Sequence, residues 1–102
     1  MSDGTAVVRD DVDHHRLVID EEGPEPMLRY RVRDGRLFIV HTEVPENMQH
    51  AGLAGLLVRA AVAKARAERL TVVPWCPYAR SWLLDHSSEA GDVDIDWENL
   101  PT

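Results

Sequence analysis

The chain lacks several features that mark particular classes of protein. Its single cysteine excludes a disulfide framework within the chain. No apolar run reaches the roughly 18 residues that cross a bilayer, so we expect no membrane partner. The segment Met1–Gly4 has neither the basic nor the apolar part of a secretion signal. These absences together favour a cytoplasmic location.

Basic residues are also few. The chain has 11 Lys and Arg against 18 Asp and Glu, a formal net charge of −7. Because duplex binding requires a field of Lys and Arg, we expect no nucleic-acid partner. The acidic residues cluster at 10–13, 20–22 and 92–96. These clusters are either a solvated surface or an acidic rim that attracts a cationic amine substrate.

The length of 102 residues bounds the architecture. It is the size of one small domain, which excludes a deep cleft between two domains. We therefore expect a single domain over residues 1–102, with a core at about 15–90 and an acidic C-terminal arm at 87–102. We expect this arm to be loosely packed, with Trp97 as its only large anchor. The domain is expected to be a monomer or a weak dimer.

The first half of the chain carries strand patterns. Residues 7–10 are either a frayed tail or an edge strand. Three further strands are predicted. Residues 16–19 form a short apolar run, residues 27–33 alternate between apolar and basic, and residues 36–42 are almost continuously apolar. Asp34-Gly35 between the last two predicts a tight primed turn. The first half is therefore expected to be an antiparallel meander.

The second half alternates helix and strand. Residues 52–69 read as a helix, because apolar side chains recur at spacings of three and four: Leu53, Leu56, Leu57, Ala60, Ala61 and Ala67. A strand at 70–73 and a second helix at 78–86 follow. A helix between two strands makes a β-α-β crossover with a parallel pair. The predicted fold class is α+β: a mixed, mostly antiparallel sheet with two main helices.

The start of the first helix has the character of an anion site. The strand that ends near His41–Val44 is followed by a loop of small residues that opens directly into the helix. Backbone N–H groups at a helix N-terminus point at one spot and favour a phosphate or pyrophosphate. Gly52 and Ala54 would let such a ligand approach the backbone.

A second motif, Pro74-Trp75-Cys76-Pro77, lies where the last strand meets the last helix. Ligands in α/β sheets sit off the carboxyl ends of parallel strands. The two strands concerned end near His41–Val44 and near Val73. We therefore expect His41 and Cys76 to approach each other beside the small-residue loop.

These motifs resemble a known family. The spacing Gln49-x-x-Gly52-x-Ala54 is similar to the Gln/Arg-x-x-Gly-x-Gly/Ala signature with which GCN5-related N-acetyltransferases bind the pyrophosphate of acetyl-CoA. The likeness extends in order through further motifs over about residues 15–90: His41-Thr42-Glu43-Val44-Pro45, Gly52-Leu53-Ala54, Leu57-Val58, Val73-Pro74-x-Cys76-Pro77-Tyr78 and Trp82-x-x-x-His86. The chain most resembles the short acetyltransferase-like branch of that family.

The resemblance implies a truncated form of the family's fold, with acetyl-CoA as co-substrate and transfer of the acetyl group to an amine, either a small amine or a lysine side chain. Val44 and the strand before it would face the pantetheine arm, and Cys76 would lie near the thioester. The residues implied in cofactor binding are Glu43, Val44, Gln49, His50, Ala51, Gly52, Leu53, Ala54, Gly55 and Tyr78. The alternative is a non-catalytic acyl-CoA-binding or protein-interaction module.

The chain departs from the family pattern in two places. The loop reads Gln49-His50-Ala51-Gly52 where Arg-Gly-x-Gly is usual, so one cation is lost and His50 replaces a glycine. Larger members often carry a tyrosine acid on the last helix. Here that region holds Trp82 and Leu83, which supply no proton.

Cys76 and His41 are the candidate catalytic residues. A helix N-terminus favours the thiolate form of a cysteine, so Cys76 is interpreted as an acid or a transient acyl carrier, with a small buried hydrophobe as the alternative. The imidazole of His41 suits a general base, with a structural role as the alternative, and Glu43 is a second candidate base. No metal is expected, because the remaining histidines, His14, His15 and His86, lack metal-ligand spacing. Trp75, Trp82 and Trp97 are interpreted as core or pocket walls.

Overall fold

Short strands joined by tight turns build the first half of the domain. In the computed structural model, which describes residues 7–20, 24–46 and 52–101, these strands are β1 (Val8–Asp11), β2 (Arg16–Ile19), β3 (Met27–Arg33) and β4 (Arg36–Glu43). A single 3-10 turn, η1 (Val12–His14), joins β1 to β2. Each strand pairs antiparallel with the next. The predicted meander is confirmed, and the first segment is an edge strand.

The turn between β3 and β4 follows from its two residues. Asp34 and Gly35 both have positive φ, 51° and 75°. This is the conformation of a primed two-residue turn, which glycine adopts without steric cost and which aspartate tolerates. Arg33 pairs with Arg36 directly across it, so the predicted hairpin is confirmed.

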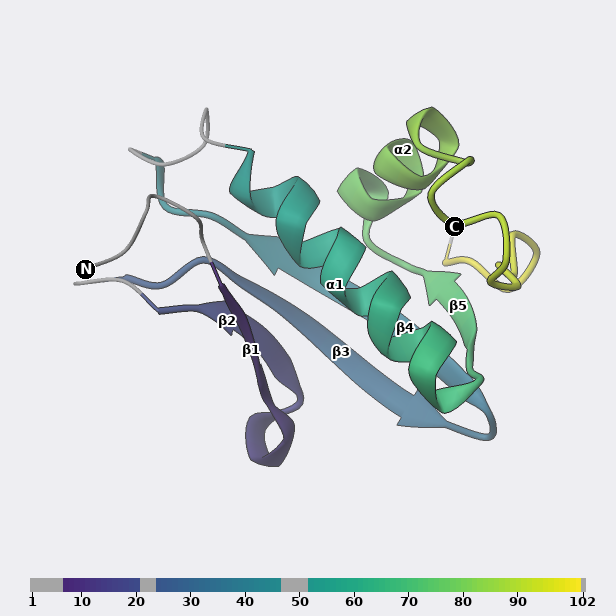
Figure 1. Cartoon of the computed structure of the whole chain (residues 1–102), viewed down its shortest axis with the longest axis horizontal. Coiled ribbons are helices and arrows are strands. Elements are labelled where there is room, and N and C mark those ends of the chain that lie inside the picture. The colour runs from purple at the N-terminus through teal and green to yellow at the C-terminus, as the bar shows by residue number, and fades with distance from the viewer. Residues whose placement is uncertain (1–6, 21–23, 47–51, 102) are drawn as a thin grey trace.

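The second half forms a β-α-β crossover. Helix α1 (Leu53–Glu68) leads to β5 (Thr71–Pro74), which pairs parallel with β4, and α2 (Pro77–Asp85) follows. The sheet order is β1-β2-β3-β4-β5, and both helices lie on the same face of the sheet (Figure 1). The predicted α+β class, with a mixed sheet and two main helices, is confirmed.

One helix face packs on the sheet. The side chains of α1 that are buried follow a spacing of four: Leu57, Val58, Ala61, Val62 and Ala65. The prediction that Ala67 belongs to this face is wrong, because Ala67 is exposed. It lies two residues beyond Ala65, about 200° further around the helix.

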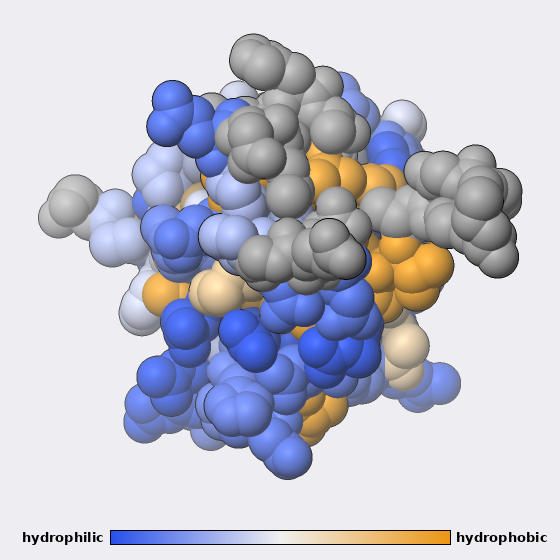
Figure 2. Space-filling view, turned by 90° about the vertical axis from the view of Figure 1, so that its left-hand side faces the viewer, coloured by the Kyte–Doolittle hydropathy of each residue, from blue (hydrophilic) through white to orange (hydrophobic). Residues whose placement is uncertain are grey.

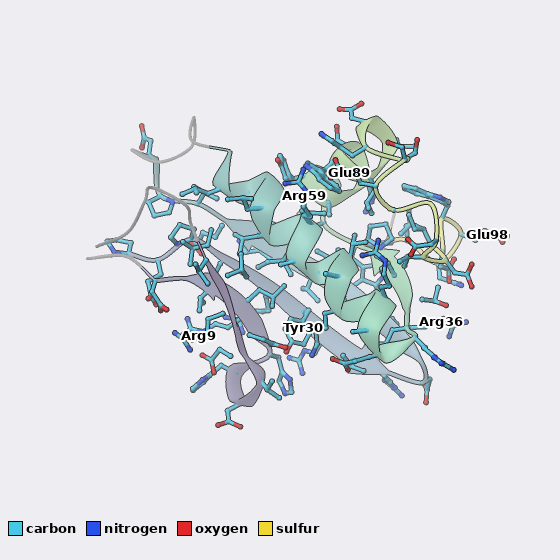
Figure 3. All side chains as sticks on the ribbon, viewed as in Figure 1. Arg9, Tyr30, Arg36, Arg59, Glu89 and Glu98 are labelled. Carbon is cyan, nitrogen blue, oxygen red and sulfur yellow. The ribbon has the colours of Figure 1, made fainter. Side chains whose placement is uncertain are left out.

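The C-terminal segment is held in place, which corrects the expected loose arm. Ile95 bridges Val72 in parallel on the outer edge of β5, with Val72 N donating to Asp94 O at 2.9 Å and Asp96 N donating to Val72 O at 2.8 Å. Arg59 also pairs with Glu89 at 2.8 Å, and the two side chains meet beside α1 in Figure 3. Trp97 is 41% exposed, whereas Ile95 packs against the core. The free edge of β5 therefore fixes this segment.

Candidate functional site

The candidate site lies where β4 extends beyond β5. The parallel ladder runs only from Arg36 opposite Thr71 to Ile39 opposite Pro74. Pro74 has no N–H to continue it, and the chain turns into α2 after one last bond, from Cys76 N to Ile39 O at 2.9 Å. The edge of β4 that faces β5 is consequently without a β5 partner from residue 40 to 43.

A cavity opens beside this edge. It has a volume of about 280 Å³ and is lined by Thr42 and Val44 from the end of β4, Ala54 from the first turn of α1, and Tyr78 from the first turn of α2. Three elements far apart in sequence therefore converge on one space. Of the predicted site residues, Val44, Ala54 and Tyr78 lie together here.

A β-bulge decides which side chains of β4 face this cavity. Tyr30 pairs with Ile39 and Arg29 pairs with His41, so Val40 is an extra residue in β4. A bulge reverses the alternation of the strand. Ile39 and Thr42 therefore face the helices, while His41 points to the opposite, exposed face.

This bulge separates two residues that were expected to approach each other. Cys76 is 5% exposed, and its thiol donates a hydrogen bond to Thr42 Oγ1 at 3.5 Å. Its neighbour on β4 is therefore Thr42, which the sequence analysis missed, and not His41. Without the bulge, simple alternation would have put His41 on the same face as Ile39. Glu43 is exposed on the same face as His41.

Cys76 occupies the N-cap position of α2. Pro77 follows at the first helical position, and the first turn carries no acidic residue. Proline suits this position because its missing N–H has no partner there in any helix. The predicted placement of the thiol at a helix N-terminus is confirmed.

Tyr78 brings a second polar group to the cavity. Its side chain is 44% exposed. Burial of the ring, and then the neighbouring Cys76, raise the pKa of the Tyr78 hydroxyl above its usual range. The hydroxyl therefore stays protonated at neutral pH and remains a hydrogen-bond donor.

The N-terminus of α1 meets the same space. Gly52 is the N-cap residue with φ of 72°, and no acidic residue lies in the first turn of the helix. Gly52 has no side chain to cap the first N–H groups of α1, and N–H groups left open in this way can accept an anion. Gln49, His50 and Ala51 lie outside the described residues.

Gly55 has a packing role that the sequence did not reveal. A Cβ at this position would lie 2.9 Å from Trp82 Nε1 and 3.7 Å from Tyr78 Oη. Only glycine lets α1 and α2 approach this closely. Trp82 in turn stacks on His86 at 4.2 Å, which explains the Trp-x-x-x-His spacing. Leu53 is half-buried and packs against the core.

The described residues contain neither a group of metal-ligating side chains nor a helix that could span a membrane. Within residues 7–20, 24–46 and 52–101, no three His, Cys, Asp or Glu side chains are grouped to hold a metal ion. No helix in this part of the chain is long and apolar enough to cross a membrane. His14 is instead hydrogen-bonded to Asp11 at 3.0 Å.

Comparison with known proteins places the chain in one family. A search among curated proteins finds no match. A family model described as GCN5-related N-acetyl-transferase matches residues 15–93. This range holds β2 to β5, both helices, the bulge and the cavity between Thr42 and Tyr78. The chain therefore belongs to the GCN5-related N-acetyltransferase family.

Proposed function

We propose that this domain binds acetyl-CoA and transfers its acetyl group to an amine. The observation that carries the proposal is the cavity lined by Thr42, Val44, Ala54 and Tyr78, where β4 extends beyond β5 and where α1 begins. The family supplies acyl transfer in general; acetyl-CoA and the amine are the specific parts of the proposal.

The residues present fit acetyl-CoA in two ways. The edge of β4 at residues 40–43, which has no β5 partner, would offer backbone groups to the amide-bearing pantetheine arm, and the N-terminus of α1 would offer N–H groups to a pyrophosphate. Figure 2 shows the end of the molecule at which α1 begins. In this view the hydrophobic surface lies mostly in the upper half, and the lower half is mostly hydrophilic. An apolar surface with a few convergent donors is typical of cofactor sites.

Acetyl-CoA supplies an activated acetyl group whose C–S bond is exchanged for a C–N bond to the amine. The chain must then accept a proton from the attacking nitrogen and return one to the leaving sulfur. Cys76 is the proposed source of this proton, which would pass through the Thr42 hydroxyl, because Thr42 accepts a hydrogen bond from the thiol and lines the cavity. Tyr78 adds an O–H donor that faces the same space.

His41 and Glu43 are the proposed bases. Both are exposed on the face of β4 opposite the helices, so an amine that approaches from that face reaches them before it reaches the cavity. Either base would remove a proton from the ammonium form of the amine on that face, before the free amine enters the cavity. The base stays in contact with solvent, into which this proton is released.

Calorimetric titration tests the binding step. Acetyl-CoA should bind at micromolar concentration, while adenosine alone should give no heat. A polyamine or a lysine peptide added with acetyl-CoA should then release free thiol, measured with a thiol reagent.

Absence of acetyl-CoA binding contradicts the proposal. Binding without thiol release from any amine identifies a binding module instead. An acetyl adduct on the protein, detected by mass spectrometry and lost in Cys76→Ala, assigns Cys76 as an acyl carrier instead of a proton donor.

A further inference from the structure

The face of the sheet opposite the helices carries a row of arginines. Arg29, Arg31 and Arg33 alternate along β3 and are all exposed. Their register partners on β4 are His41, Phe38 and Arg36. Because Leu28 and Tyr30 on the same strand are buried under α1, the arginines point away from the helices.

Two of these arginines differ from others in this acidic chain in their ion pairing. Arg16 pairs with Asp11 at 2.9 Å and Arg36 lies 3.9 Å from Asp96. Arg29 and Arg31, by contrast, have no ion-pair partner among the described residues. Two neighbouring guanidinium groups without a counter-charge repel each other and attract an anion.

A groove runs beside the arginine row. It has a volume of about 390 Å³ and is lined by Arg31, Val32, Arg33, Phe38 and Trp75. Its aromatic wall is fixed, because Phe38 and Trp75 stack at 5.1 Å with an interplanar angle of 6°, and Trp75 Nε1 donates to Asn99 O at 3.0 Å. Trp75 precedes Cys76 in the chain, so one wall of the groove is one residue from the N-cap of α2.

We propose that this groove binds an acidic polypeptide segment in extended conformation and, resting on the proposed function, that this segment carries the acceptor amine. Alternate residues of a strand are about 6.8 Å apart. An extended peptide that lies along β3 would therefore match carboxylates at alternate positions to Arg29, Arg31 and Arg33. A planar guanidinium binds a carboxylate through two parallel hydrogen bonds.

The distribution of charge favours a narrow acidic peptide over a nucleic acid. The arginine row is on the central strand β3, whereas Asp11 on β1 and Asp96 beyond β5 lie toward the two edges. A ligand that follows β3 meets Arg29 and Arg31 first, and an acidic side chain only at Arg33, which lies 3.5 Å from Asp34. The continuous phosphates of a broad nucleic acid would also face the acidic edges. The same path brings a peptide past His41, which pairs with Arg29, and so delivers its amine to the proposed base.

Fluorescence anisotropy with a labelled peptide of alternating Glu and Ser tests the proposal. The unmodified protein should bind this peptide, and the same peptide with Lys in place of Glu should not bind. The double variant Arg29→Ser, Arg31→Ser should bind about tenfold more weakly. Arg69→Asn is the matched control, since Arg69 is exposed at the end of α1 with φ of 57°, a conformation that asparagine tolerates.

Equal binding by the double variant, or no binding by the unmodified protein, overturns the proposal. Equally tight, arginine-dependent binding of a single-stranded oligonucleotide overturns it in favour of nucleic acid, and arginine-dependent dimerisation in sedimentation overturns it in favour of a second copy of the chain. Calorimetry with acetyl-CoA separates this test from the proposed function. The double variant should bind acetyl-CoA as the unmodified protein does, and peptide binding does not require acetyl-CoA.

Discussion

The hydroxyl of Tyr30 donates a 2.5 Å hydrogen bond to Asp10, and so joins the central strand β3 to the edge strand β1 beneath α1. Lys64 of α1 donates to the same carboxylate at 2.8 Å and lies over the Tyr30 ring. Tyr30 is 2% exposed and is labelled under α1 in Figure 3. One carboxylate thus holds together a helix and two strands that are not neighbours in the sheet.

Replacing Asp10 should destabilise the fold. Asp10→Ala leaves the buried Tyr30 hydroxyl without its acceptor and removes one of the two carboxylates on the Lys64 ammonium group, which keeps Glu68 at 2.7 Å. The expected cost is about 1–3 kcal/mol. Urea denaturation should show a lower midpoint with little change in slope. Asp13→Ala is the control, because Asp13 is an exposed neighbour for which the structure gives no ion pair. Equal stability of the two variants would show that the Tyr30–Asp10–Lys64 contact contributes nothing.

The same contact sets the alkaline limit of stability. Burial and then the hydrogen bond to Asp10 raise the pKa of Tyr30 to about 12. Burial lowers the pKa of Lys64, but hydrogen bonds to Asp10 and Glu68 outweigh it, and the net pKa is raised. A folded pKa above the unfolded value means that the stabilisation is complete below the unfolded pKa, near 10 for both groups. It should be lost as pH rises from about 10 through 12.

Unfolding followed by urea at pH 8 and at pH 11 measures this loss. Tyr30→Phe should be less stable than the unmodified protein at pH 8, and the difference should shrink at pH 11. A difference that stays constant between the two pH values would exclude ionisation of Tyr30 as the cause.

Gly55→Ala should disturb both the packing of the helices and the site. Its Cβ would lie 2.9 Å from Trp82 Nε1, and relief of such a clash in a packed interface costs about 1–3 kcal/mol. Gly91→Ala is the control, since its Cβ would approach nothing closer than 3.6 Å. Thermal denaturation should separate the two variants, and a Gly55→Ala protein as stable as Gly91→Ala would refute the close approach of α1 and α2.

Gly52→Ala should weaken acetyl-CoA binding. Gly52 has φ of 72° and an added Cβ meets nothing within 4 Å, so the only penalty is backbone strain of about 1–2 kcal/mol. Gly35→Ala, with φ of 75° and equally open surroundings at the far end of the sheet, imposes the same strain. Both variants should lose similar stability, but only Gly52→Ala should lose affinity in calorimetry. Equal affinities would place the anion site elsewhere.

Cys76→Ala should slow acetyl transfer without weakening acetyl-CoA binding. Loss of a positioned proton donor typically lowers a rate about a hundredfold or more. The side chain is buried against Thr42 and does not line the cavity, so affinity should persist. An unchanged rate would assign the thiol a packing role only.

The sequence predicted what local patterns determine. The alternation in Met27–Arg33 predicted β3 with its observed bounds, and Asp34-Gly35 predicted the turn. The bulge at Val40 arises from how β3 and β4 pair, and no local pattern marks it. The sequence therefore placed His41 rather than Thr42 beside Cys76.

Longer-range pairing also escaped the sequence. Acidic and apolar residues alternate in 92–97, but the segment was interpreted as an acidic arm. It is held because β5 leaves a free edge for Ile95. The family resemblance implied Gly55 in cofactor binding only. Its packing role could not be predicted, because the approach of Trp82 depends on how the two helices cross. The alternation that predicted β3 also places Arg29, Arg31 and Arg33 on one face, but the significance of this row depends on which neighbours neutralise it in the folded structure.

The most direct test of the account is to fill the cavity. Ala54→Leu places a larger side chain among Thr42, Val44 and Tyr78, and Ala63→Leu places the same side chain on the exposed face of the same helix. Calorimetric titration with acetyl-CoA should show binding by the unmodified protein and by Ala63→Leu, and none by Ala54→Leu. Equal binding by both variants, or no binding by the unmodified protein, would contradict the assignment of this cavity to acetyl-CoA.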